Sequence, residues 1–172
     1  GQEVESRICE AALLLSQKAG YRNAGTVEFL VDADGSFYFL EINTRLQVEH
    51  TVTEITTGID IVRRQIRLAR GQPLDIEQEQ VFCRGCAIEM RINAEDPRQD
   101  FAPESGKTVS VYLSPGGPGI RLDGFVYQGY TIPAEYDSLL VKLTVYGFTW
   151  REATSRLARA LRNFVIVGPK TT

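Results

Sequence analysis

Three segments of the chain carry apolar residues at three- and four-residue spacing, which predicts three amphipathic helices. The helices are expected over residues 3–19, over 61–70 and from Thr149 onward. Gly20, just after the first, is a typical C-terminal stop. The expected buried stripes are Ile8, Ala11, Ala12, Leu15 and Ala19; Ile61, Ile66 and Ala69; and Ala153, Leu157, Ala160, Leu161 and Phe164.

Polar residues mark the expected starts of the later helices. Asp60 is a candidate N-cap for the second, and Thr149 with Glu152 fits a capping box for the third. Thr51 with Glu54 fits a further capping box, although a chance match in this threonine-rich segment is an open alternative.

Alternating apolar and polar residues on both sides of Asp34-Gly35 predict a β-hairpin. Asp-Gly is a strong signal for a two-residue loop in which both central residues take positive φ. With such a loop, Glu28 on the first strand lies directly opposite Glu41 on the second. Like charges in that position destabilise the hairpin, because cross-strand Cβ atoms are only about 5 Å apart.

The facing carboxylates are tolerated if one is protonated, if a cationic side chain lies between them, or if a metal bridges them. Asn43 projects from the same face as Glu41, and this set of oxygens suits Mg²⁺ or Mn²⁺. An ordinary solvated strand face is the competing interpretation. If the chain stays extended, Arg45, Gln47 and Glu49 continue this face.

The segment from 72 to 82 is polar and acidic without a clear period, so we predict a domain boundary there, between residues 1–75 and 82–172. The second half is rich in short alternating segments punctuated by Gly and Pro. In the strand expected over 86–93, Cys86, Ile88, Met90 and Ile92 form a core face. Arg91 lies on the other face. It would form either a structural ion pair or a contact with a polar or anionic ligand.

Composition narrows the class of protein. The 172 residues are 43% hydrophobic and 24% charged with a net charge of −3, which is enough for a core and provides no basic surface for nucleic acid. No apolar run approaches the ~18 residues of a membrane span. An odd count of three cysteines indicates a reducing compartment, and Cys83 with Cys86 is more typical of a structural strand start than of a zinc site.

The candidate chemistry is phosphoryl transfer. The carboxylate–amide cluster would neutralise phosphate charge, Arg45 would add a fixed positive charge, and Glu49 is a possible base. His50, the single histidine, is expected to point away from this face and to orient another group. We find no serine nucleophile elbow, no phosphate-binding glycine loop and no histidine pair for a metalloprotease.

Long runs of the sequence closely resemble the biotin carboxylase component of biotin-dependent carboxylases, from about Ala24 to the end. The matching runs are FLEINTRLQVEHTVTEITTGIDIVRRQIRLARGQPL, CRGCAIEMRINAEDP and YDSLLVKLTVYG. The resemblance implies an α+β fold: part of an ATP-grasp antiparallel sheet with helices, then a β-rich biotin carboxylase C-terminal domain that ends in a helix.

The resemblance also implies a role for each matching residue. Glu28 and Glu41 are metal ligands that also touch ATP, and Asn43 is the third metal ligand. Arg45 is the catalytic arginine, Gln47 and the Val48 backbone contact bicarbonate, Glu49 is the base that deprotonates bicarbonate, and Arg91 contacts the ureido oxygen of biotin.

The implied cofactors are ATP, Mg²⁺ or Mn²⁺, and biotin on a carrier partner. The implied partners are a biotin carboxyl carrier domain and a carboxyltransferase, in a homodimer or larger complex located in the cytoplasm, or in the mitochondrial matrix of a eukaryote. The N-terminal domain and ATP lid of the family do not match this chain, so the chain alone is expected to be inactive.

Two alternatives stay open. The first is another ATP-grasp ligase, such as a relative of carbamoyl-phosphate synthetase, which shares the Glu, Glu, Asn set but not the strand with Arg91. The second is a non-catalytic module for dimer or carrier docking, which predicts that activity survives the loss of Glu41 or Arg45.

Overall fold

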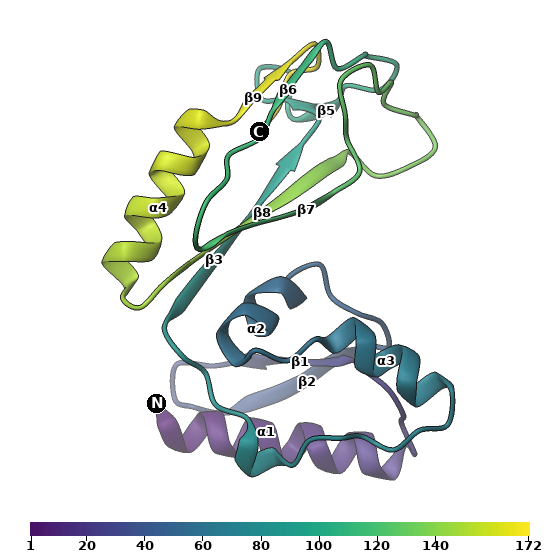
Figure 1. Cartoon of the computed structure of the whole chain (residues 1–172). Coiled ribbons are helices and arrows are strands. Elements are labelled where there is room, and N and C mark those ends of the chain that lie inside the picture. The colour runs from purple at the N-terminus through teal and green to yellow at the C-terminus, as the bar shows by residue number, and fades with distance from the viewer. The chain divides into compact units, whose positions relative to one another are not determined.

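The computed structural model describes residues 1–172, apart from the side chain of Gln2. The chain forms two compact units. Unit 1 comprises Gly1–His50 and Ile59–Gln80, and unit 2 comprises Thr51–Gly58 and Val81–Thr172. Helices α1–α4 and several small antiparallel sheets make up a mixed α+β protein, as predicted (Figure 1).

Unit 1 contains one β-hairpin and the helices α1 and α3. Its elements are α1 (Gln2–Lys18), β1 (Thr26–Val31), β2 (Phe37–Asn43), α3 (Ile61–Ala69) and the short 3₁₀ helix η1 (Gln78–Gln80). The predicted Asp60 cap is confirmed, since its side chain accepts a hydrogen bond from the Arg63 N–H at 2.8 Å. The expected buried stripe of α3 is wrong at Ile66, which is 53% exposed. The prediction is also wrong at Ala69, which is exposed, whereas Ile61 is half-buried as predicted and Leu68 is half-buried as well.

The β1–β2 hairpin differs from the prediction in its loop but not in its central pair. The Asp32 N–H donates to the Ser36 carbonyl and the Gly35 N–H to the Asp32 carbonyl, so the loop has three residues, 33–35. Gly35 has φ of +84° and Asp34 does not share a positive φ. The longer loop would shift the register by one, but Leu40 is left out of the ladder as a bulge and restores it. Glu28 therefore still pairs with Glu41.

The chain does not stay extended beyond Asn43, so the condition for Arg45, Gln47 and Glu49 to continue the strand face is not met. Strand β2 ends at Asn43, the chain bends at Arg45, and α2 (His50–Thr57) begins directly after a turn at Val48 and Glu49. The side chains of Arg45, Gln47 and Glu49 consequently do not continue the face of the strand. A turn closed by the His50 N–H and the Gln47 carbonyl, 3.3 Å apart, replaces the alternation.

Unit 2 is built on the sheet β3-β8-β7, and the long strand β8 lies in the middle. Helix α4 packs against β8 and β3, and its capping box of Thr149 and Glu152 is confirmed. The apolar segment that follows this helix is strand β9, which pairs with β6. The elements are β3 (Cys86–Asn93), β4 (Glu95–Asp96), β5 (Ala102–Pro103), β6 (Val111–Leu113), β7 (Ile120–Gly124), β8 (Leu139–Gly147), α4 (Trp150–Asn163) and β9 (Val165–Val167).

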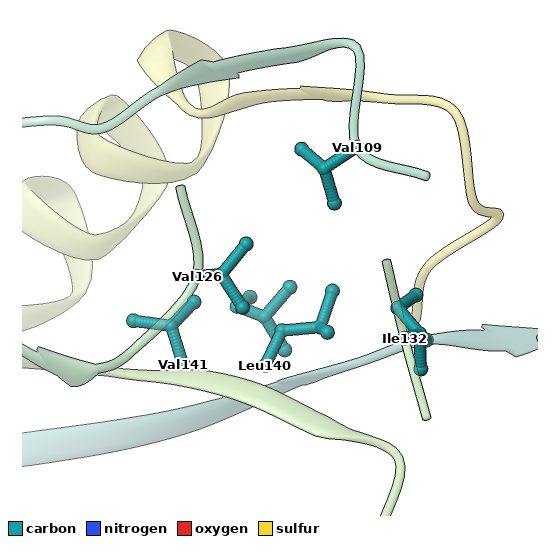
Figure 2. Close-up of a cluster of buried hydrophobic side chains, with 7 residues drawn as sticks. Val109, Val126, Ile132, Leu140 and Val141 are labelled. Atoms are coloured by element: carbon teal, nitrogen blue, oxygen red, sulfur yellow. The ribbon is translucent and has the colours of Figure 1, made fainter. Parts of the chain in front are cut away.

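The hydrophobic core of unit 2 gathers around β8. Figure 2 shows the larger cluster, in which side chains of β8 lie with those of the segments before β6 and after β7. A second cluster joins Leu143 and Val145 of β8 to Ala160 of α4. The predicted core face of β3 holds at Ile92 but is wrong at Met90, which is 38% exposed. The labelled residues of the first cluster are Val109, Val126, Ile132, Leu140 and Val141.

Two further observations concern cysteines and membrane spans. Cys9, Cys83 and Cys86 are free thiols, and Cys86 is the half-buried first residue of β3. Among the described residues, no helix combines the length and the hydropathy needed to cross a membrane.

Candidate functional site

The Glu28, Glu41 and Asn43 side chains meet at the open end of the β1–β2 hairpin, as the sequence predicts. Glu28 comes from β1, and Glu41 and Asn43 come from β2. The Asn43 Nδ2 atom donates to Glu28 Oε1 at 2.8 Å and to Glu41 Oε1 at 2.9 Å. The nitrogen of the Asn43 amide therefore occupies one position that is adjacent to both carboxylates.

This arrangement fits a hard cation by its donor chemistry. A half-turn of the Asn43 amide would place Oδ1 where Nδ2 now lies, and carboxylate and amide oxygens would then converge on one point. Mg²⁺ accepts such oxygens and normally keeps further positions for water or phosphate. The cluster contains only two acidic side chains, and the described residues include no group of three or more His, Cys, Asp or Glu side chains suited to a metal.

The segment between β2 and α2 carries the remaining candidate residues of unit 1. Arg45 Nη1 donates to Gln47 Oε1 and to the Leu46 carbonyl, both at 3.2 Å, so these two candidate residues lie together. His50 Nδ1 lies 2.9 Å from the Gln47 carbonyl. Val48 is half-buried and Glu49 is exposed. The structure thus brings Arg45 and Gln47 into contact within a bent loop rather than along a strand.

Arg91 belongs to unit 2, where it is exposed on β3 opposite Lys142 of β8. Lys142 is only 8% exposed, which is unusual for a lysine. The neighbouring position on the same face of β3 is Glu89, which pairs across the strands with Thr144. Arg91 is therefore part of a polar strip on the β3-β8 sheet.

Sequence reasoning missed a buried polar cluster in unit 2. The Thr51 hydroxyl of α2 donates to Glu89 Oε2 and lies 2.7 Å from the Thr144 hydroxyl, and both threonines are fully buried. The predicted capping box of Thr51 and Glu54 is wrong, because Thr51 lies inside α2 and its hydroxyl is engaged by β3 and β8. The polar face of β3 was the only signal in the sequence that pointed to Glu89.

An arginine held by two carboxylates lies beside this cluster. Arg121 of β7 donates to both carboxylate oxygens of Asp123, at 2.7 and 2.8 Å, and its Nη1 donates to Glu54 Oε2 at 2.7 Å. These bonds, chiefly those to Asp123, raise the pKa of the Arg121 guanidinium, so it is charged at every accessible pH. Glu54 is thereby paired across to β7 and is not free to cap α2.

Comparison with known proteins gives matches over nearly the whole chain. Residues 2–77 match the ATP binding domain of the carbamoyl-phosphate synthase L chain, and residues 89–172 match the biotin carboxylase C-terminal domain. The chain is 52% identical over 170 residues to a pyruvate carboxylase subunit of Methanothermobacter thermautotrophicus, covering 99% of this chain and 34% of that protein. It is 51% identical over 170 residues to a biotin carboxylase of Nostoc sp., covering 99% of this chain and 38% of that protein.

A solved structure agrees with these matches. The biotin carboxylase domain dimer of the Hydrogenobacter thermophilus 2-oxoglutarate carboxylase, in complex with MgADP, ADP and bicarbonate, superposes with a TM-score of 0.89 and 47% identity. That match covers 98% of this chain and 37% of the other. The chain spans little more than a third of the length of these proteins.

An ATP-binding domain followed by a biotin carboxylase C-terminal domain defines the class of protein, which is the ATP-grasp type. Within that class, the chain belongs to the biotin carboxylase family, as the resemblance in its sequence implied.

Proposed function

We propose that this chain is part of a biotin carboxylase that uses MgATP and bicarbonate to carboxylate biotin on a carrier domain, through carboxyphosphate. The main support is the convergence of Glu28, Glu41 and Asn43 on one point, at the end of the strand that leads into the Arg45–Glu49 loop. The biotin carboxylase C-terminal match and the relative in complex with MgADP and bicarbonate are consistent with this chemistry.

The cluster of Glu28, Glu41 and Asn43 would hold Mg²⁺ or Mn²⁺ through oxygen atoms. The ion, when bound, would neutralise charge on the phosphates of ATP and so favour attack at the γ-phosphorus. This chain would supply three hard oxygen ligands, two of which are charged. The ligands lie on two paired strands, which fix the distances between them.

The loop after β2 would handle bicarbonate. Arg45, oriented by its bond to Gln47 Oε1, would bind the bicarbonate charge, and Gln47 with the Val48 backbone would complete the contacts. Glu49 would remove the proton of bicarbonate while one bicarbonate oxygen forms a bond to the γ-phosphorus and the bond to ADP breaks. Bicarbonate is a weak nucleophile, so a base and a cation held at the same place raise its reactivity.

Arg91 would bind the ureido oxygen of biotin, and Arg45 would stabilise the biotin anion that accepts the carboxyl group. In the full-length protein, we expect Arg91→Ala to lower kcat/KM for free biotin by about 10- to 100-fold, the size of a lost charged hydrogen bond, while ATP binding is retained. Steady-state kinetics together with nucleotide titration measure both quantities. Arg98→Ala, an exposed arginine in the same unit, is the control.

Substitutions in the full-length protein separate the alternatives. Another ATP-grasp ligase, such as a carbamoyl-phosphate synthase relative, is favoured by the match of residues 2–77, but it has no use for biotin. It would leave Arg91→Ala without a specific effect on biotin. A non-catalytic docking module would keep the activity of the parent protein after Glu41→Ala or Arg45→Ala, whereas a biotin carboxylase would lose it.

We further propose that this chain has little or no carboxylase activity alone, because it spans about a third of its relatives and its sequence has no phosphate-binding glycine loop. ATP-dependent carboxylation of biotin by the purified 172-residue chain would contradict this. A carrier domain and a carboxyltransferase are the proposed partners. The relatives act in different carboxylases, so the acyl acceptor belongs to that partner rather than to this chain.

A further inference from the structure

The first turn of α2 is attached to unit 2 by a row of three side chains that cross its sheet. Glu89 of β3 pairs with Thr144 of β8, and Thr144 pairs in turn with Arg121 of β7. Because directly paired residues project from the same face, the three side chains form one line across the sheet. This row meets α2 at Thr51 and Glu54.

The contact at Thr51 is a directed chain of hydroxyl groups. A threonine hydroxyl has one hydrogen to donate, so Thr51 donates to the Glu89 carboxylate and accepts from Thr144. Both threonines are fully buried, where hydrogen bonds are strong and unpaired polar groups are costly. The other carboxylate oxygen of Glu89 is buried without a hydrogen-bond partner among the described residues. The hydrogen bond from Thr51 to Oε2 therefore fixes the position of the carboxylate.

The second contact lies one turn further along α2. Glu54, at the i+3 position from Thr51, is on the same side of the helix and pairs with Arg121 at 2.7 Å. Arg121 is itself fixed by the two-pronged pair with Asp123, a geometry that leaves the guanidinium little freedom. The backbone adds a third anchor, since the Arg84 N–H donates to the Thr56 carbonyl at 2.8 Å.

The position of this helix matters because of what precedes it. Thr51 follows Glu49 by two residues, and consecutive Cα atoms are about 3.8 Å apart, so their Cα atoms lie within about 8 Å of each other. The row in unit 2 therefore holds the C-terminal end of the loop that carries Arg45, Gln47 and Glu49. Its N-terminal end continues from β2 of unit 1.

We infer that Glu89 and Arg121 are positioning residues for the proposed reaction: acting through Thr51 and Glu54, they fix the start of α2 and thereby place Glu49. The inference depends on the proposed function, since it assigns these residues a role in placing the bicarbonate base. Neither residue touches a reacting atom in this scheme. They would affect how precisely the loop with Glu49 is positioned. A displacement of about 1 Å in a reacting group can lower the rate about 100-fold.

The test compares Thr51→Val with Thr51→Ser in the full-length protein. Valine keeps the shape of threonine and removes the hydroxyl, whereas serine keeps the hydroxyl. We expect Thr51→Val to lower kcat for bicarbonate-dependent ATP hydrolysis about 10- to 100-fold, with KM for ATP changed less than about twofold, and Thr51→Ser to restore most of kcat. Thr131→Val, which breaks the exposed hydroxyl pair with Thr108, is the control and should leave kcat unchanged.

A purely structural role gives a different result. Thr51→Val would then lower the melting temperature but, assayed well below it, would keep the wild-type kcat, and this outcome overturns the inference. If Thr51→Val does not fold, Glu54→Ala decides: a fall in kcat at constant KM for ATP supports the inference, and an unchanged kcat overturns it. A wild-type protein without bicarbonate-dependent ATP hydrolysis would overturn the proposed function itself, and the inference with it.

Discussion

The side-chain amide of Asn43 determines how the two facing glutamates are held. The two hydrogens of its nitrogen go one to each carboxylate, so a neutral donor separates two negative charges. A cation bound through the amide oxygen needs the opposite orientation of the same group. Cation binding and the present hydrogen bonds therefore exclude each other, and the net gain from Mg²⁺ is reduced by the bonds it replaces.

This competition predicts the behaviour of Asn43→Asp. Without Mg²⁺, a third carboxylate replaces the donor, so we expect the melting temperature to fall and the free energy of unfolding to drop by about 1–3 kcal/mol. With Mg²⁺, three charged ligands should produce a larger rise in melting temperature than in the wild type. Thermal melting with and without Mg²⁺ measures both. Asn163→Asp adds the same charge outside the cluster and should leave the Mg²⁺ response unchanged.

If Mg²⁺ changes the melting temperature of neither the wild type nor Asn43→Asp, Glu28, Glu41 and Asn43 do not form a competent metal site by themselves. The wild-type comparison alone also tests the simpler expectation that divalent cations relieve the repulsion between Glu28 and Glu41.

At the scale of elements, helix caps and strand pairing could be predicted where they depend on residues close in the sequence. The predictions failed where contacts with distant residues determine the structure. The Asp60 and Thr149 caps were predictable because the capping residue and its partner are three positions apart in the sequence. The Thr51 cap failed because its hydroxyl bonds to strands far along the chain. The Glu28–Glu41 pair was predicted correctly, although a three-residue loop and a bulge at Leu40 compensate for each other.

The loop of the hairpin gives a stability prediction. Gly35 has φ of +84°, and a Cβ at this position would meet the Val4 side chain at 3.2 Å. We expect Gly35→Ala to lower the free energy of unfolding by about 1–2 kcal/mol, because a residue with a side chain is strained in this conformation. Urea denaturation measures the change. Gly116→Ala, which has open space around it, serves as the control and should be nearly neutral.

At the scale of the whole molecule, the two compact units are not continuous stretches of the chain. The first expected domain ended at residue 75, whereas unit 2 also takes Thr51–Gly58 from within that range. The helix α2 joins unit 2 through Glu89, Thr144 and Arg121, which lie far along the sequence and carry no pattern that links them to it. The candidate residues were recognisable as motifs, but the residues that bond to α2 were not.

The C-terminal end of unit 2 is tied to the segment after β3 by a buried carboxylate. Asp96 is 1% exposed, and Lys170 Nζ and the Arg98 N–H donate to it. The Lys170 bond is the largest of the effects that together lower the pKa of Asp96 below its ordinary 3.8. A carboxyl with a lowered pKa in the folded state stabilises the protein above its unfolded pKa, and this stabilisation disappears as the pH falls through the folded pKa.

Lys170→Met keeps the apolar stem and removes the ammonium, so we expect the free energy of unfolding to fall near pH 7. The difference from the wild type should narrow as the pH drops below about 4, where Asp96 is protonated in the unfolded chain and then in the folded one. Urea denaturation of both proteins between about pH 7 and pH 2.5 follows this difference. Lys107→Met, an exposed lysine in the same unit, should show no such narrowing. A gap between wild type and Lys170→Met that stays constant over this range would show that Lys170 acts through packing, not through the charge of Asp96.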